Sequence, residues 1–216
     1  MTYKMLELYC GSKSVSNAFK SKGWEVYTVD WDFRLEPTVV MDISNITKEK
    51  IIEICGRMPD VIWASPDCTT YSVMAMSIHR RKLGTMFVPK SSYAEFCDKA
   101  NINLRNILAD YDGIYFIENP RGIMRKMKFW KCNRYTVTYC QYGLDRQKPT
   151  DIWTNHPDPK FKPACKPGSN CHIASPRGTS NGSQGKDTIE LSKIPDQLSE
   201  HIASICDDYF KGKEVS

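Results

Sequence analysis

The chain has 216 residues, of which 41% are hydrophobic and 25% charged, ordinary values for a globular protein that exclude wholesale disorder. The formal net charge is +5. The sequence has no apolar run long enough to span a bilayer and no basic leader before an apolar stretch, so we expect a soluble intracellular protein. Nine cysteines at scattered spacings do not fit a small secreted disulfide scaffold, so we expect reduced thiols.

The first half of the chain alternates strand and helix patterns at the spacing of βαβ units. Strands are expected over residues 5–9, 24–29, 37–41, 61–64 and 114–117, and helices over residues 15–22, 47–55 and 93–109, with a long loop over residues 65–89. Later elements are strands over 135–142 and 151–154, a loop-rich stretch over 156–186 and an amphipathic helix over 195–210. This order predicts a Rossmann-like α/β fold with a mostly parallel central sheet and a small loop-rich appendage.

The turn after the first strand, from Tyr9 to Ser14, is small and polar and contains Gly11. A glycine there lets the backbone approach a ligand closely, and the following helix offers its amino end. Asp30 closes the second strand about 20 residues on, where an acid grips a ribose diol. Asp42 closes the third strand and is placed to accept a hydrogen bond from an adenine amino group. Both acids also suit turn caps, but the three features together favour a nucleoside cofactor.

Two chemically active side chains follow buried strands. Cys68 stands in the turn Ser65-Pro66-Asp67-Cys68 after the fourth strand, and Glu118 ends the fifth. Because the carboxyl ends of parallel strands share one edge, where ligands bind, the thiol and the carboxylate are expected to meet there. They suit a nucleophile and an acid, so the sequence predicts an enzyme. The alternative is that Cys68 is a buried packing cysteine.

Cations gather over residues 121–166, with eleven Lys and Arg against three Asp. Aromatic residues are interleaved with them, namely Phe129, Trp130, Tyr135, Tyr139, Tyr142 and Trp153. This mixture suits a polyanion such as nucleic acid, because cations neutralise phosphates and rings stack on bases. A solvated surface is the other interpretation.

The motifs occur in the order found in the cytosine-C5 DNA methyltransferases, and the chain resembles that family, particularly its small phage or prophage-type members. The resemblance covers nearly the whole chain. The residues that carry it are Leu6 to Gly11, Asp30, Asp42-Ile43, Ser65 to Cys68, Glu118-Asn119-Pro120, Tyr142-Gly143 with Arg146 and Lys148, and Lys193-Ile194-Pro195. It implies the Rossmann-like fold of S-adenosylmethionine-dependent methyltransferases.

The resemblance also implies the site. The residues expected to contact S-adenosylmethionine are Tyr9, Gly11, Ser12, Asp30, Trp31, Asp42, Ile43 and Pro66. Catalysis is expected from Cys68, which would add to C6 of cytosine so that C5 takes the methyl group, and from Glu118, a general acid at N3. Arg146 would contact the base or a phosphate. Since the base has to leave the stack, the expected partner is DNA with a flipped-out or single-stranded cytosine.

Two departures from the family pattern keep alternatives open. Asp67 stands where many relatives have a second proline, and its charge disfavours the Cys68 thiolate unless it points away or faces a cation such as Arg146 or Lys148. Thr150 stands where a second arginine is common. The alternatives are a catalytically silent module that binds nucleic acid or cofactor, and the same chemistry on RNA.

Residues 1–154 are expected to form the S-adenosylmethionine-binding catalytic domain, residues 155–189 a reduced target-recognition segment, and residues 190–216 a helix that returns to the catalytic domain. Within the segment, Lys162, Lys166 and Arg177 are expected to hold phosphates. The resemblance implies a cytoplasmic protein of a bacterium or a phage-infected host cell, with no membrane partner. The oligomeric state is left open.

The recognition segment contains three residues of metal-ligand type, Cys165, Cys171 and His172. A zinc ion there would fasten a segment too polar to form its own core. CxxC pairs are absent, and a fourth ligand would have to come from one of three residues, Cys132, Cys140 or His156. We therefore expect solvent-facing loop thiols and no metal.

Overall fold

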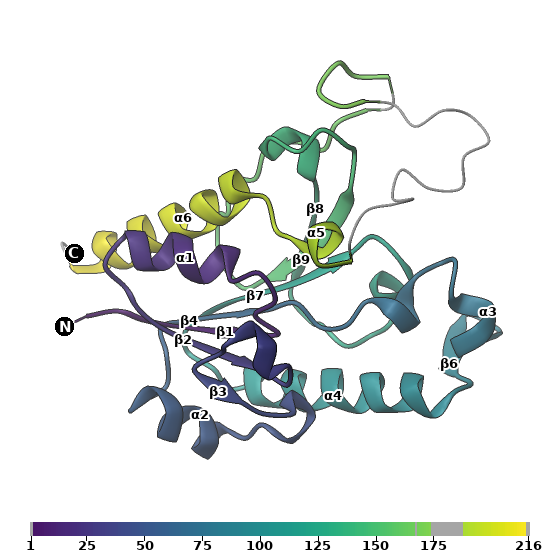
Figure 1. The fold of residues 1–216 in the computed structure, drawn as a ribbon, viewed down its shortest axis with the longest axis horizontal. Helices are drawn as coiled ribbons and strands as arrows, with labels where there is room; N and C mark the ends of the chain where they lie inside the picture. The colour runs from purple at the N-terminus through teal and green to yellow at the C-terminus, as the bar shows by residue number, and fades with distance from the viewer. Residues whose placement is uncertain (1, 167, 174–187, 215–216) are drawn as a thin grey trace.

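The computed structural model describes residues 2–166, 168–173 and 188–214. Within these ranges the centre is a seven-stranded sheet with the order β3-β2-β1-β4-β7-β9-β8 (Figure 1). The strands are β1 (Lys4–Leu8), β2 (Glu25–Asp30), β3 (Val39–Val40), β4 (Val61–Ala64), β7 (Ile114–Pro120), β8 (Asn133–Thr138) and β9 (Pro149–Thr154). The first five run parallel, whereas β9 is antiparallel to both β7 and β8. The strand order reverses between β1 and β4, so the predicted Rossmann-like α/β fold is confirmed.

Helices cover both faces of the sheet (Figure 1). The elements are α1 (Ser14–Ser21) and α6 (Asp196–Glu214) on one face, α2 (Lys48–Cys55) and α4 (Ser92–Leu108) on the other, and the short α5 (Thr188–Ser192) before α6. The alternation of side chains along a strand builds two cores. On β4, Trp63 packs in the core under α1 and α6, and its neighbour Ile62 packs in the core under α2 and α4.

Side-chain caps begin the two helices of the second face. Oγ1 of Thr47 accepts a hydrogen bond from the backbone N of Lys50 at 3.2 Å, and Oγ of Ser91 accepts one from the N of Ala94 at 3.2 Å. Each cap satisfies a backbone N–H that the helix itself leaves unpaired, and contributes about 1 kcal/mol. None of the helices in the described ranges is long and apolar enough to cross a membrane.

The stretch between β4 and α4, expected to be a loop, contains secondary structure. It forms the short helix α3 (Met76–His79) and the antiparallel hairpin of β5 (Arg80–Leu83) and β6 (Met86–Pro89). The hairpin escapes detection because only Arg80 of β5 is buried, so its hydrophobicity does not alternate. Figure 1 shows α3 and β6 at the end of the molecule opposite the two termini.

The expected strand over residues 135–142 is shorter than predicted. β8 ends at Thr138, and Tyr139–Tyr142 form a 3₁₀ turn. Tyr139 and Tyr142 are both buried although they stand three positions apart, a spacing that fits one side of this turn and not one face of a strand. Gly143 follows with φ +90°, a left-handed conformation that favours glycine.

Candidate active site

The turns after the parallel strands place the predicted site residues at one edge of the sheet. Gly11 follows β1, Asp30 ends β2, Asp42 follows β3, Cys68 follows β4, and Glu118 lies in the last part of β7. Parallel sheets bind ligands at this carboxyl-terminal edge. The glycine turn, the two acids and the thiol–carboxylate pair therefore share one side of the molecule.

The turn that presents Cys68 is fastened to the neighbouring strand. Nδ2 of Asn119, the residue after Glu118, donates a hydrogen bond to the carbonyl oxygen of Pro66 at 2.8 Å. Both Asn119 and Pro66 are buried, so the bond is shielded from water. It fixes the end of β4 relative to the end of β7, and with them the relative positions of the thiol and the carboxylate.

Cys68 is an exposed residue, unlike the buried Cys10 after β1, so the alternative of a buried packing cysteine is wrong. Desolvation by the protein atoms around the sulfur raises the pKa of Cys68 to about 11. The carboxylates of Asp67 and Glu118 act in the same direction, and the ammonium of Lys148 opposes them. The free protein thus holds an accessible cysteine in its protonated form at neutral pH.

Glu118 is 5% exposed, and its Oε1 accepts a hydrogen bond from the hydroxyl of Tyr139 at 2.9 Å. Burial raises the pKa of the Glu118 carboxyl, while Lys148 and the Tyr139 hydroxyl lower it. Lys148 has its own pKa lowered by burial, and its Nζ donates to the carbonyl oxygen of Leu191 at 2.9 Å. A carboxyl that keeps its proton closer to neutral pH suits proton donation, and one cation lies close enough to act on both reactive groups.

Asp67 is oriented by its own turn. Its Oδ1 accepts a hydrogen bond from the backbone N of Thr69 at 2.7 Å, and its carboxylate is close enough to Tyr93 on α4 to raise the pKa of that phenol. Among the described residues, Asp67 forms no hydrogen bond or ion pair with Arg146 or Lys148, the cations that the sequence allowed. Its charge still raises the pKa of the Cys68 thiol.

The buried side chain of Asp30 links the glycine turn to the end of β2. Asp30 is 5% exposed; its Oδ2 accepts from the N of Gly11 at 3.3 Å and its Oδ1 from the N of Asp32 at 3.1 Å. Tyr9 and Gly11 both adopt left-handed φ values, +59° and +44°. Burial raises the pKa of the Tyr9 phenol, and nearby carboxylates, Asp42 among them, raise it further by smaller amounts. The Tyr9 ring therefore lies close to the acids of this edge.

The remaining predicted cofactor contacts differ in exposure. Ser12 and Trp31 are exposed, with 67% of Trp31 open to solvent. Asp42 is exposed and caps a short turn, accepting from the N of Ser44 at 2.9 Å. Ile43 is buried in the core under α2 and α4, so only its backbone remains to contact a ligand.

Arg146 lines a cleft of about 470 Å³ between the turn after β8 and the start of α6. Its Nε is buried and has no hydrogen-bond partner among the described residues. The cleft is narrow at Gly143, where an added Cβ would come 2.8 Å from Nε2 of Gln197 on α6. Arg146 is also close enough to Lys148 to lower the pKa of that amine.

A buried arginine, for which the sequence predicts no role, supports the turn that presents Cys68. Arg80 is 2% exposed, and its guanidinium donates to the carbonyl oxygen of Thr70 at 2.7 Å and to both carboxylate oxygens of Asp98 on α4. The Tyr71 ring lies 4.2 Å from the guanidinium carbon. Nothing in the sequence marks Arg80 as buried, because it begins an otherwise exposed strand.

Four of the six aromatic rings in the basic stretch over residues 121–166 are buried in the two cores, namely Phe129, Tyr139, Tyr142 and Trp153. For these four the prediction that they stack on bases is wrong. Trp130 and Tyr135 are partly exposed, and for them it stays a prediction. Lys162 is exposed but lies 5.0 Å from the Tyr142 ring and donates to the carbonyl oxygen of Gln141 at 3.0 Å, while Arg177 lies outside the described residues.

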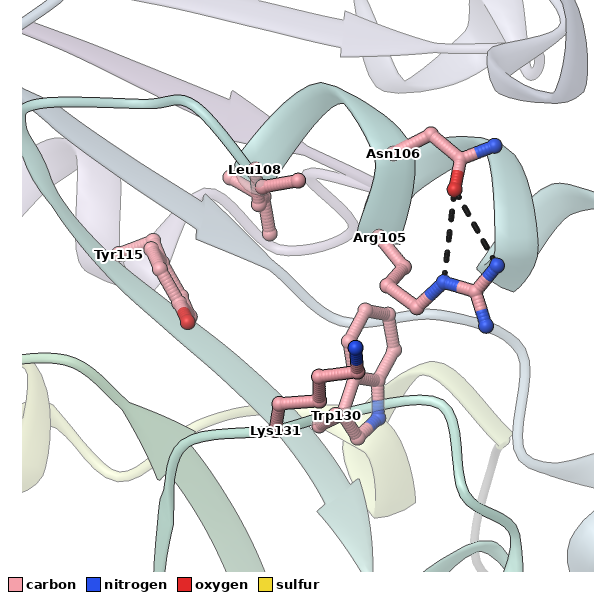
Figure 2. Close-up of a pocket in the computed structure, with 7 residues that line it drawn as sticks. Arg105, Asn106, Leu108, Tyr115, Trp130 and Lys131 are labelled. Carbon is pink, nitrogen blue, oxygen red and sulfur yellow. Dashed lines mark hydrogen bonds between the residues drawn. The ribbon is translucent and has the colours of Figure 1, made fainter.

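A second cavity, of about 490 Å³, lies against α4 (Figure 2). Its walls include Arg105 on α4, Tyr115 on β7 and Trp130 after it. Tyr115 and Glu118 are three positions apart on β7, so their side chains point to opposite faces of the sheet. The cavity is therefore separate from the edge that carries Cys68.

No protein-family model matches the chain. Its sequence is 28% identical over 159 residues to a probable DNA (cytosine-5)-methyltransferase of Frog virus 3 (isolate Goorha), a match that covers 70% of each chain. Similar solved structures include the S. pombe Dnmt2 methyltransferase, with TM-score 0.46 and 15% identity over 71% of this chain and 49% of that one. Another is the Entamoeba histolytica methyltransferase EhMeth, with TM-score 0.49 and 13% identity over 70% and 52%.

The chain thus spans about half the length of these solved structures. Its own strand order is that of the Rossmann-like methyltransferase fold. In sequence, the chain is similar to a probable DNA (cytosine-5)-methyltransferase over 70% of its length.

Proposed function

We propose that the protein transfers a methyl group from S-adenosylmethionine to C5 of cytosine in DNA, through a covalent bond between Cys68 and C6. The observation that carries the proposal is the pairing of an exposed thiol with a buried, hydrogen-bonded carboxyl at one sheet edge, held together by the bond between Asn119 and Pro66. Carbon 5 of cytosine is a poor nucleophile, so this chemistry needs both groups.

In the proposed reaction the Cys68 sulfur, as a thiolate, forms a bond to C6, and the electron pair displaced from the ring double bond makes C5 nucleophilic. Glu118 shares its proton with N3 as negative charge develops on the ring. C5 then takes the methyl group from the sulfonium and leaves a neutral thioether. Loss of the C5 proton breaks the C6–S bond and returns the thiolate.

Methyltransferases of this kind use S-adenosylmethionine, and the glycine-turn edge fits an adenosyl group. Gly11 has no side chain to block a ligand, and Trp31 offers an exposed ring. The Asp30 oxygens each accept one backbone bond and keep lone pairs for ribose hydroxyls. The bound cofactor would supply the methyl group, and these residues would orient it beside the turn that presents Cys68.

The segment that follows Cys68 supports a nucleic acid as the substrate. Exposed apolar side chains gather there, each between 56% and 68% open to solvent, namely Val73, Met74, Ile78, Leu83 and Met86. Arg81 and Lys82 on β5 are exposed beside them. Cations hold phosphates, and apolar side chains wedge between bases when one base leaves the stack. DNA is favoured over RNA because the curated relative is described as a probable DNA methyltransferase.

We further propose that the chain is a small, phage-type member of the family, with residues 155–189 as its reduced recognition segment. Thirty-three residues, 155–187, separate β9 from α5, which is too short for a separate domain. Readout of the target is then confined to a short site.

The decisive experiment compares wild type with Cys68→Ser on duplex DNA, single-stranded DNA and RNA of one sequence, measuring 5-methylcytosine by mass spectrometry. Wild type should methylate DNA, Cys68→Ser should lose the activity, and Cys132→Ser should keep it. In 5-fluorocytosine a fluorine replaces the C5 hydrogen, so the elimination that breaks the C6–S bond is blocked. With this base in the DNA, wild type should form a stable covalent complex through Cys68. Methylation of RNA alone, or binding without any methylation, would refute the proposal.

A further inference from the structure

The four side chains of metal-ligand type at the base of the recognition segment form one compact group. They are Cys140, Cys165, Cys171 and His172, named here the Cys3His cluster. Their three Sγ atoms and the imidazole nitrogen all lie within 4.8 Å of one another. Of the three candidates that the sequence left open for a fourth ligand, the structure thus selects Cys140.

The other two candidates are engaged elsewhere. His156 is buried, and its Nε2 lies 3.3 Å from the carbonyl oxygen of Ile205 on α6. Cys132 lies within hydrogen-bonding reach of Tyr115, on the α4 face of the sheet. Cys140 reaches the cluster because β8 ends at Thr138 and the chain then turns. The sequence-based prediction of a continuous strand over residues 135–142 did not include this turn.

Four of the distances between ligand atoms in the cluster lie within about 0.6 Å of those in a tetrahedral zinc site. A Zn–S bond of about 2.3 Å and tetrahedral angles place two sulfurs about 3.8 Å apart, and a sulfur and a nitrogen about 3.6 Å apart. Cys140 Sγ lies 3.2 Å from Cys165 Sγ and 3.6 Å from Cys171 Sγ. Nδ1 of His172 lies 3.8 Å from Cys165 Sγ and 3.5 Å from Cys171 Sγ.

Amide donors surround the sulfurs. Nε2 of Gln147 donates to Cys165 Sγ at 3.0 Å, and Nε2 of Gln141 donates to Cys171 Sγ at 3.3 Å. The backbone N of Cys165 is itself held by Oγ1 of Thr138 at 2.9 Å. Donors aimed at ligand sulfurs stabilise thiolates and orient them, as the outer shell of a metal site does.

We propose that the Cys3His cluster binds one Zn²⁺ as a structural site, which replaces the sequence-based expectation of free loop thiols. Three thiolates and one imidazole form a closed tetrahedral set of the kind that zinc prefers. Of the four ligands, Cys140 follows β8, and the others come from the segment after β9. The ion therefore fastens a polar segment, which cannot bury a core of its own, to the catalytic fold.

The site also bears on Arg146. Cys140 belongs to the 3₁₀ turn that leads to Arg146, and the backbone N of Ile173, next to His172, donates to the carbonyl oxygen of Asp145 at 2.7 Å. Zinc would thus hold both ends of the short connection that carries this arginine. Loss of the ion should loosen the cleft beside α6 as well as the recognition segment.

The test is metal analysis of protein produced in zinc-supplemented medium and purified without a polyhistidine tag. We expect about one zinc per chain, a loss of most of it in Cys171→Ser, and no change in Cys132→Ser, a partly buried thiol outside the cluster. Replacing zinc with Co²⁺ in the wild type should give the visible absorption bands of tetrahedral thiolate coordination, a readout that does not require a variant to fold.

Wild type that carries no zinc and gives no tetrahedral cobalt spectrum after reconstitution would overturn the proposal. So would a mass showing the loss of two hydrogens, mapped to a disulfide between two cluster cysteines. Cys68→Ser should bind zinc as wild type does, so failure of the metal site and failure of the proposed methyl transfer can be told apart.

Discussion

Arg80 and Asp98 form a two-bond ion pair beneath the turn that presents Cys68. Nη1 and Nη2 of Arg80 reach the two carboxylate oxygens of Asp98 at 3.0 and 2.7 Å, and the same guanidinium holds the backbone of Thr70. The hydroxyl of Tyr71 donates to Asp98 as well, at 2.7 Å. The turn that presents Cys68 is thus supported by a buried charged network that includes Asp98 on α4.

Replacing one member of this pair should be costly. Arg80→Met leaves the Asp98 carboxylate without its cation, and breaking a buried pair in this way costs about 3–5 kcal/mol of unfolding free energy. Urea unfolding measures the loss. Arg34→Met is the matched control, because Arg34 pairs with Asp32 at the surface and its loss should cost far less. Equal losses in the two variants would contradict the supporting role of Arg80.

Asn119→Ala should reduce kcat by removing the bond that fixes the Cys68 turn to β7. The carbonyl oxygen of Pro66 is then buried without its partner, which costs about 1–3 kcal/mol of stability. Because the proposed cofactor contacts other than Pro66 lie on or after β1, β2 and β3, KM for S-adenosylmethionine should change less than kcat. Asn155→Ala, which removes two backbone bonds near the opposite end of β7, should lower stability and leave kcat unchanged. A wild-type kcat in Asn119→Ala would show that the bond between Asn119 and Pro66 is not needed to position Cys68.

The strands and the reactive pair are predictable from sequence because their signals are local. Val61–Ala64 is an unbroken apolar run, and Cys68 and Glu118 each follow such a run, so the parallel topology alone brings them to one edge. Thr47 likewise caps α2 where its residue type predicts.

The parts that escape prediction depend on contacts between distant residues. Arg80 can be buried because it forms an ion pair with Asp98, which lies on α4. Cys140 joins the Cys3His cluster through a turn that begins at Tyr139, where the alternation of apolar residues along β8 (Tyr135, Val137) still continues. Buried rings such as Tyr139, which contacts Glu118, look from the sequence like exposed stacking platforms.

Asp67→Asn should make Cys68 more reactive. Asp67 is one of the carboxylates that raise the pKa of the thiol to about 11, so removing its charge lowers that pKa and increases the thiolate fraction at any pH below it. Alkylation of Cys68 by iodoacetamide, followed by peptide mass analysis across pH, measures the shift. Lys148→Met should move the profile the other way, and Asp145→Asn should leave it in place. No difference between Asp67→Asn and wild type would show that this charge is too well solvated to matter.

Removing the two exposed cations of β5 should weaken DNA binding evenly across sequences. Arg81→Ala with Lys82→Ala deletes two phosphate contacts, so the slope of log affinity against log salt should fall by about 2. Fluorescence anisotropy with a labelled duplex measures it. Lys20→Ala with Lys22→Ala, near the end of α1 away from the catalytic edge, is the control of equal charge. If both double variants lose the same affinity for DNA, the hairpin of β5 and β6 does not contact the DNA more than the surface of α1 does.

Glu7 should make the protein less stable as pH rises towards neutrality. It is buried on β1, and its Oε2 accepts a hydrogen bond from the backbone N of Ser16 at 2.9 Å. Burial raises the pKa of Glu7 from 4.5 to about 7. Between these values the folded chain keeps a proton that the unfolded chain has lost, so the unfolding free energy falls with rising pH, by about 3 kcal/mol in all, and levels off above pH 7.

Glu7→Gln removes the titrating group and keeps an oxygen that accepts from Ser16. Its unfolding free energy should therefore decline less than that of wild type across this window, and the two curves should separate most above pH 7. Urea unfolding at several pH values measures the difference, with Glu53→Gln on the exposed side of α2 as a control that retains the wild-type decline. Parallel curves for wild type and Glu7→Gln would mean that Glu7 ionises in the folded protein as freely as in the unfolded chain.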